Sequence, residues 1–217
     1  NKWGRSVITD LDAIYCINLE RRPDRWESFK QVWSPYDLKI SKFSAVDAQD
    51  LMYEKGEYAN HSHFHNLGSL GCTLSHIQVL ERALYSKQKE ILILEDDAVP
   101  CEDFVGRFNT AYSELPDDYQ FCYVGGSNIT PPEKLTGHVG IAKNTKSTAG
   151  YLIKTALAPT IIQFVKAQMF NAAIDEVYAA AQQQLPIHIF TPRLIHQEEG
   201  YSDIINQNVN YSWMRDL

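Results

Sequence analysis

The stretch Ile91-Leu92-Ile93-Leu94-Glu95-Asp96-Asp97 decides the fold class. Four consecutive apolar residues predict a short strand that is buried on both faces, as in a parallel sheet covered by helices. Three carboxylates follow this strand at once. Because ligands of α/β sheets bind beyond the carboxyl ends of the strands, the three acids mark the sheet edge where a site is expected.

Similar apolar runs and helical patterns alternate along the rest of the chain. We expect further strands at 13–19, 38–44, 121–124, 151–153 and 187–191, and helices at 23–32, 72–86, 104–112, 159–169 and 174–184. Residues 67–71 are expected to form a glycine-bearing loop, and Gly125-Gly126 to end a strand. The alternation predicts an α/β fold with a mainly parallel central sheet flanked by helices. No linker or repeat divides residues 1–217, so we expect a single domain.

Composition narrows the classes of protein and partner. The 217 residues are 44% hydrophobic and 22% charged, which excludes a disordered chain. The formal net charge of −7 argues against a nucleic-acid partner. No apolar run approaches the ~20 residues of a membrane span. We therefore expect a soluble protein in the cytoplasm or at a membrane periphery, or in the secretory lumen if a leader was removed before Asn1.

The acidic triplet is the sharpest chemical feature. Glu95, Asp96 and Asp97 repel one another at the end of a buried strand, and a divalent cation would offset that repulsion. Oxygen ligands suit Mg²⁺ or Mn²⁺, which in turn suit a diphosphate. A solvated acidic turn that caps the next helix is the alternative.

Arginines follow the first expected strand. Arg21, Arg22 and Arg25 surround the start of a helix, where guanidinium groups and the helix dipole favour a phosphate. The alternative is surface charge on an amphipathic helix.

Three further features stand near expected strand ends or helix starts. Gly71 precedes Ser75 and His76, and a glycine lets the backbone approach a ligand closely. His196 follows the last strand and could reach the edge that holds Asp97, where imidazole and carboxylate together would suit Mn²⁺. The alternating His61, His63 and His65 fit a polar loop better than a zinc site, because no fourth ligand has the right spacing.

Taken together, these segments resemble glycosyltransferase family 25. Each motif is weak alone, but they occur in the family's order over nearly the whole chain. The matching segments are Ile17–Arg25, Phe43–Ala48, Leu70–His76, Leu94–Asp97, Ala149–Ile153, Ile174–Glu176 and Pro192–Ser202. One departure is Ala48, which stands where the family usually has glycine.

The resemblance implies a GT-A fold, a nucleotide-sugar donor (most often UDP-linked) and a divalent metal, usually Mn²⁺. Asp97 would ligate the metal, and His196 would complete its shell. Glu95 and Asp96 would face the ribose and the sugar. The remaining implied donor-binding residues lie in the turns that flank the uridine and in the Gly71 segment: Asn18, Arg21, Arg22, Arg25, Ala45, Val46, Asp47, Gly71, Ser75 and His76.

The resemblance also places Asp175 and Glu176 near the acceptor, a glycan or glycoprotein such as collagen-type hydroxylysine or a lipopolysaccharide core. In an inverting reaction the acceptor hydroxyl needs a carboxylate base, for which we favour Asp175 over Glu176. A helix N-terminus is expected to keep the pKa of Asp175 low. If configuration is retained, no such base is required and this assignment fails. The alternative is that both acids only cap the helix.

Two other functions stay open. A nucleotidyltransferase or phosphohydrolase would use the same acidic strand end with further carboxylates for a second metal, and Asp47 and Asp203 are the candidates. A non-catalytic nucleotide-sugar-binding module is the third possibility.

Overall fold

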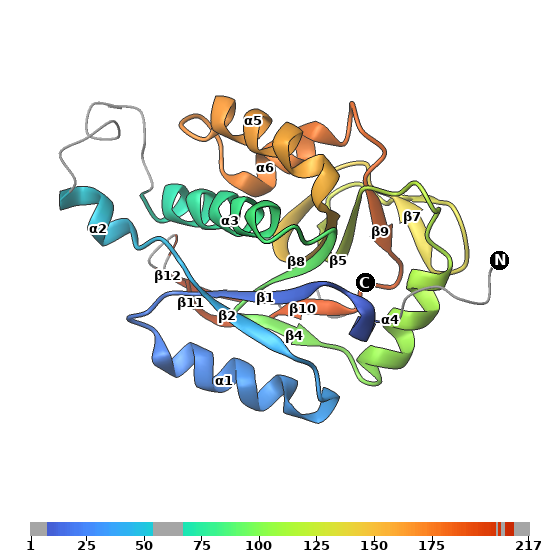
Figure 1. The fold of residues 1–217 in the computed structure, drawn as a ribbon, viewed down its shortest axis with the longest axis horizontal. Helices are drawn as coiled ribbons and strands as arrows, with labels where there is room; N and C mark the ends of the chain where they lie inside the picture. Colours follow the sequence, from blue (N-terminus) through green and yellow to red (C-terminus); the bar gives the residue numbers. More distant parts are fainter. Residues whose placement is uncertain (1–7, 54–66, 203, 205–206, 211–217) are drawn as a thin grey trace.

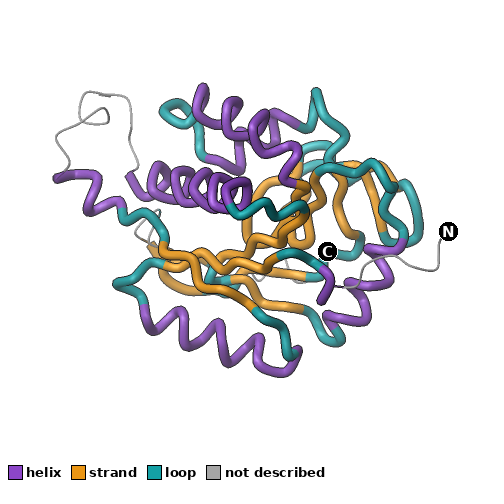
Figure 2. Tube along the Cα trace, in the orientation of Figure 1, coloured by secondary structure: helices purple, strands orange, loops and turns teal. Residues whose placement is uncertain are grey.

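The computed structural model describes residues 8–53, 67–202, 204 and 207–210. Its main feature is an eight-stranded sheet with helices on both sides (Figures 1 and 2). The strands of this sheet, in spatial order, are β2 (Ile40–Ser44), β1 (Ala13–Asn18), β3 (Glu90–Glu95), β8 (Thr145–Lys154), β5 (Phe121–Asn128), β9 (His188–Phe190), β7 (Val139–Ile141) and β6 (Glu133–Lys134).

Two layers of helices enclose the sheet. In Figure 1, α3, α5 and α6 lie on one side and α1 on the other, with α4 near the edge that carries β7. The helices are α1 (Pro23–Trp33), α2 (Ala48–Tyr53), α3 (Leu67–Tyr85), α4 (Phe104–Ser113), α5 (Ala158–Gln168) and α6 (Ile174–Ala181), with 3₁₀ turns at Ile8–Asp10, Ser34–Tyr36 and Thr155–Leu157.

Strand β3 joins two hydrophobic cores, as its apolar sequence predicts. Ile91 and Ile93 pack in the core under α3, α5 and α6. Leu92 and Leu94 pack in the core that contains α1 and α4. All four side chains are fully buried. Because successive strand residues point to opposite faces, a strand covered on both sides must be apolar throughout. Cys16 and Cys122 are buried free thiols in the second of these cores.

The α/β class with a large sheet flanked by helices is confirmed, but the expectation of a mainly parallel sheet is wrong. Strand β1 is parallel to β2 and β3, and β5 is parallel to β9. Strand β8 is antiparallel to both of its neighbours, β3 and β5. Apolar runs indicate that a strand is buried but not in which direction it runs, so the sequence did not distinguish β8 from a parallel neighbour of β3 and β5.

Two expected breaks are wrong. Residues 67–71 form the first turns of α3 rather than a loop, and β5 continues through Gly125 and Gly126. Both errors have the same cause, which is tertiary contact. A Cβ atom on Gly71 would lie 2.8 Å from the carbonyl oxygen of Val46, and one on Gly125 would lie 2.6 Å from that of Ile195. Glycine is needed at both positions for close packing, not for a turn.

Short strands near the acidic end of β3 were not expected from the sequence. Strand β4 (Ala98–Pro100) follows the acids and pairs with β10 (Ile195–Gln197) in an antiparallel ribbon. Strands β11 (Gly200–Ser202) and β12 (Gln207–Val209) pair with each other. The polar tail therefore returns to the end of β3. Among the described residues, no helix is both long and apolar enough to cross a membrane.

Candidate active site

The carboxyl end of β3 forms part of the wall of a cavity of about 370 Å³. Helix α1, the 45–48 turn, helix α3 and the C-terminal tail supply the rest. Ten of the predicted residues line it: Arg21, Arg22, Arg25, Ala45, Val46, Ser75, His76, Glu95, Asp96 and Asp97. The other six do not: Asn18, Asp47, Gly71, Asp175, Glu176 and His196.

The acids at the end of β3 are held by α1 and by the end of β1. The Arg25 guanidinium lies 2.6 Å from Asp96 Oδ1 and 3.6 Å from Asp97 Oδ2. The side-chain amide of Asn18 donates to Asp96 Oδ2 at 2.7 Å. Asn18 is therefore a buried support for Asp96 rather than a wall of the cavity. A single guanidinium cannot neutralise three carboxylates, so the site keeps negative charge.

Among the three acids, Asp97 is the one whose ionised form is disfavoured most. Burial, followed by the charge of Glu95, raises the pKa of Asp97 to about 7, although Arg25 opposes the shift. Burial also raises the pKa of Asp96. Asp97 Oδ1 and Asn18 Oδ1 are buried acceptors without a hydrogen-bond partner among the described residues. Such oxygens are costly unless a cation or water binds them, and they suit a hard divalent metal.

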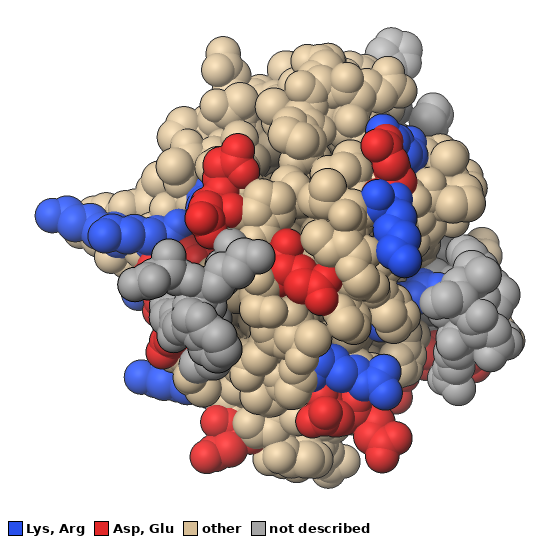
Figure 3. Space-filling view, turned by 90° about the vertical axis from the view of Figure 1, so that its right-hand side faces the viewer, with Lys and Arg blue, Asp and Glu red and all other residues tan. Residues whose placement is uncertain are grey.

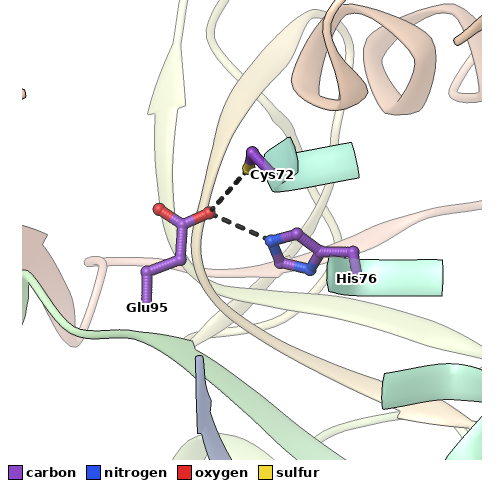
Figure 4. A group of neighbouring side chains, drawn as sticks. All are labelled: Cys72, His76 and Glu95. Carbon is purple, nitrogen blue, oxygen red and sulfur yellow. Dashed lines mark hydrogen bonds and ion pairs between the residues drawn. The ribbon is translucent and has the colours of Figure 1, made fainter. Parts of the chain in front are cut away.

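Glu95 faces α3 instead. Its Oε1 accepts hydrogen bonds from His76 Nε2 at 3.1 Å and from the Thr148 hydroxyl at 2.6 Å, and it lies 3.9 Å from Cys72 Sγ (Figure 4). Burial alone would raise the pKa of Glu95, but the hydrogen bond and charge of His76 outweigh it and hold the pKa below its usual value. Glu95 is therefore an ionised group fixed by three elements.

The 45–48 turn is fixed by α3. Ser75 Oγ accepts from the Val46 backbone N–H at 2.8 Å and donates to the Gly71 carbonyl at 2.6 Å. Gly71 does not line the cavity, because its missing side chain is filled by Val46 and Ala48. Its expected direct role at a ligand is replaced by a packing role. Ala48, the departure from the family pattern, lines the cavity as the first residue of α2.

The other two arginines also have carboxylate partners in the chain. Arg21 pairs with Asp47 at 2.7 Å, and Arg22 pairs with Asp24 at 2.8 Å. Asp47 also caps its own turn by accepting from the Gln49 N–H at 2.9 Å. Asp47 therefore holds the turn and does not offer a carboxylate for a second metal. Asp203, the other candidate for that role, lies outside the described residues, as do His61, His63 and His65.

The C-terminal tail reaches Asp97, as the sequence predicts, and Gln197 and Glu198 contact it there. Gln197 Nε2 donates to Asp97 Oδ2 at 3.3 Å, and the Glu198 N–H donates to the Asp97 carbonyl at 2.7 Å. His196 is one residue earlier in β10, opposite Val99, and adjacent strand residues point to opposite sides. Its role as a metal ligand stays a prediction.

Asp175 and Glu176 begin α6, away from the cavity wall. Burial, followed by the charge of Glu176, raises the pKa of Asp175, so the low pKa expected from the helix dipole is wrong. The charge of Glu95 also contributes to the raised pKa of Asp175. Burial first, and then the charges of Glu95 and Asp175, raise the pKa of the Cys72 thiol. Glu176 is exposed and pairs with Lys146.

Sequence reasoning missed Cys72, Thr148, Gln197 and Glu198. Cys72 had a usable signal, because it precedes His76 by four residues and such pairs share a helix face. Thr148 and Gln197 had none, since a strand register and a returning tail bring them to the site. On the face in Figure 3, the described Lys and Arg groups alternate with Asp and Glu, and no field of one sign gathers there.

Comparison with known proteins gives distant relatives. A "Glycosyltransferase 25 family member" of Drosophila pseudoobscura pseudoobscura is 37% identical over 40% of this chain and 16% of that protein. Human "Procollagen galactosyltransferase 2" is 25% identical over 70% of the chain and 27% of that protein. Human "Inactive glycosyltransferase 25 family member 3" is 24% identical over 95% and 35%. The chain thus spans about a third or less of the length of these relatives.

Among solved structures, UDP-glucose pyrophosphorylase complexed with UDP-glucose gives a TM-score of 0.49 at 8% identity, covering 87% of this chain and 92% of that one. A score and identity this low carry no information on activity. The decisive match is to a family model. The model described as glycosyltransferase family 25 (LPS biosynthesis protein) matches residues 11–178, and the chain therefore belongs to glycosyltransferase family 25.

Proposed function

We propose that this chain is a glycosyltransferase that moves galactose or glucose from a UDP-sugar to an acceptor hydroxyl and depends on Mn²⁺ or Mg²⁺. Family membership supports the reaction class. The observation that carries the proposal is the end of β3. There Asp97 lies half-buried beside two other acids, on the wall of a cavity that arginines also line. Its Oδ1 is buried and has no hydrogen-bond partner among the described residues.

The donor set fits the implied metal. Asp97 Oδ1 is the proposed metal ligand, and Asn18 Oδ1 is a second unpartnered oxygen of the kind that Mn²⁺ and Mg²⁺ bind. His196 is proposed as a further ligand. When bound, the metal supplies positive charge that stabilises the departing diphosphate.

The chain's own residues would bind and orient the donor. Arg25, already against Asp96 and Asp97, is placed to share a diphosphate, with Arg21 and Arg22 beside it on the cavity wall. Glu95 and Asp96 would accept hydrogen bonds from ribose and sugar hydroxyls. The 45–48 turn, which Ser75 fixes, would contact the uridine.

Asp175 is the proposed base. Its raised pKa favours this role, because a carboxylate that holds a proton more tightly removes one from a hydroxyl more readily. Glu176 is the weaker candidate, since it is exposed and paired with Lys146.

The decisive experiment is a transfer assay with a panel of UDP-sugars, with Mn²⁺, with Mg²⁺ and with a chelator. Acceptors are hydroxylysine collagen peptides, with and without galactose, and lipopolysaccharide-core oligosaccharides. We expect UDP release that requires both acceptor and metal. Pyrophosphate release would instead indicate a nucleotidyltransferase. Because one relative's name calls it inactive, UDP binding must be measured by calorimetry alongside. Binding without transfer to any acceptor would overturn the enzymatic proposal in favour of a binding module.

A further inference from the structure

One group of side chains beside the acids has the composition of a different kind of metal site. Cys72 and His76 lie one turn apart on α3, and Glu95 ends β3 opposite them (Figure 4). One ligand atom from each, a sulfur, a nitrogen and an oxygen, lie within 4.8 Å of one another. All three residues line the cavity.

The spacing of these atoms is close to that of a tetrahedral zinc site. Bond lengths of about 2.3 Å to sulfur and about 2.1 Å to nitrogen or oxygen place the sulfur about 3.6 Å from the oxygen and the nitrogen about 3.4 Å from it. The corresponding distances here are 3.9 Å from Cys72 Sγ to Glu95 Oε1 and 3.1 Å from His76 Nε2 to the same oxygen. For these two distances, shifts of a few tenths of an ångström would reach the values of a zinc site, and the third pair, Cys72 and His76, lies within 4.8 Å.

The surroundings orient these side chains as they do around metal ligands. His76 Nδ1 lies 2.8 Å from the hydroxyl of Tyr151, which lies 3.2 Å from the hydroxyl of Tyr178. The Nδ1 hydrogen bond fixes the imidazole ring and leaves Nε2 facing Glu95. Thr148 holds the Glu95 carboxylate in the same way. Partners of this kind, which fix ligand orientation from outside, are typical of built metal sites.

We propose that Cys72, His76 and Glu95 bind a single thiophilic divalent cation such as Zn²⁺, at a site distinct from Asp97. On binding, the Cys72 thiol would release its proton to solvent, and His76 would give up the proton on Nε2 and keep the one on Nδ1, hydrogen-bonded to the Tyr151 hydroxyl. Water from the cavity would complete the four ligands. The ligand sets separate the two metals. Sulfur and imidazole select Zn²⁺, whereas the oxygens at Asp97 suit Mn²⁺ and Mg²⁺. The proposal does not depend on glycosyl transfer, because it needs no donor.

The first test uses Co²⁺ as a spectroscopic substitute for Zn²⁺, without nucleotide. We expect one equivalent to produce the near-ultraviolet absorption band of a thiolate–cobalt bond, and Zn²⁺ to abolish it. Cys72→Ser should remove the band and weaken Zn²⁺ binding about 10–100-fold or more. Cys101→Ser is the matched control, since Cys101 is also a half-buried free thiol but does not line the cavity. No band in the wild type, or a band that survives Cys72→Ser, overturns the proposal.

A second test needs no cysteine variant. Zn²⁺ should protect Cys72 of the wild-type protein from alkylation by iodoacetamide, as mapped by mass spectrometry, while labelling of Cys101 is unchanged. Equal labelling of Cys72 with and without Zn²⁺ contradicts the site.

Asp97→Asn separates this proposal from the proposed function. It should keep the cobalt band while losing Mn²⁺-dependent transfer. If the band disappears with Asp97 as well, the thiophilic ion and the hard ion share one site and the inference of two sites is wrong.

Discussion

Strand β3 carries carboxylates at both ends, and the two ends differ in how those groups are satisfied. At the amino end, Glu90 accepts hydrogen bonds from the hydroxyls of Tyr112 and Tyr119. At the carboxyl end, Asp97 keeps a buried oxygen without a partner among the described residues and lines a cavity. Burial raises the pKa of both acids. A raised pKa therefore does not mark a site; an acceptor that the chain leaves unsatisfied does.

The largest effect is expected at the carboxyl end. Asp97→Asn should lower metal-dependent turnover about 10³-fold, because it removes a charged oxygen ligand while keeping shape and volume. The melting temperature should hold or rise, since one of three mutually repelling acids is neutralised. Steady-state kinetics and thermal unfolding measure the two effects. Normal turnover, or a clear loss of stability, would show that Asp97 has a structural role, like Glu90 at the amino end of β3.

The second prediction tests whether the site at the carboxyl end of β3 includes Asp175 on α6. Asp175→Asn should reduce turnover about 10²-fold if Asp175 is the base, with UDP and Mn²⁺ affinities unchanged. Asn caps helices about as well as Asp, so a capping role predicts a nearly neutral variant. Glu176→Gln is the neighbouring control and should have the smaller effect. Turnover near wild type for Asp175→Asn assigns this acid to the cap.

Helices α3 and α4 each carry a glycine, and the two can be compared by the same substitution to alanine. Gly71 lies on α3, which fixes the 45–48 turn. Gly71→Ala should lower the free energy of unfolding by about 1–3 kcal/mol and weaken UDP binding, because the new methyl group meets the rigid Val46 backbone. On α4, which supplies Tyr112, Gly106→Ala meets only the Asp103 carboxylate, which can rotate away. It should be neutral, or stabilising by up to about 1 kcal/mol. Denaturant unfolding and calorimetry compare the pair; equal losses would contradict the packing role of Gly71.

At the amino end of β3, we expect the stability to depend on pH through Glu90, without an effect on activity. Because burial raises the pKa of folded Glu90, the folded state binds its proton more tightly than the unfolded state. This contribution to stability is present below the unfolded pKa and is lost as pH rises through the folded pKa. Glu90→Gln should remove that decline and leave turnover near the wild-type rate. Unfolding free energies of both proteins from pH 4 to pH 8 test this prediction. A strong loss of turnover in Glu90→Gln would show that the amino end of β3 has a functional role.

The smallest effect is expected at a surface carboxylate that is fully paired. Hydrogen bonds, from Thr136 first and then His138, lower the pKa of Glu114 from 4.5 to about 2. Its contribution is therefore present above pH 4.5 and lost as pH falls towards 2, the opposite sign to Glu90. Glu114→Gln should reduce the loss of unfolding free energy between pH 4.5 and pH 2 by less than about 1 kcal/mol, because the carboxylate is near the surface. If the loss of stability at acid pH is the same in Glu114→Gln and in the wild type, the hydrogen bonds of Glu114 contribute nothing to stability.

The sequence by itself determined the α/β class, the doubly buried strand β3 and the acids at its end. These follow from local patterns, since four apolar residues before three carboxylates can hardly be arranged otherwise in a sheet covered on both faces. It also indicated that Arg21–Arg25 and the 45–48 turn lie at the same edge, because each follows a strand, β1 or β2, that runs parallel to β3.

Only the tertiary structure decided strand direction, the return of the tail and the partner of each polar group. The antiparallel course of β8 brings Thr148 and Tyr151 to Glu95 and His76, and no pattern within residues 145–154 encodes it. The pairing of β10 with β4 places Gln197 against Asp97. Hydrogen bonds across 50 to 100 residues depend on register, and a shift of one position exchanges the side chains that face a site.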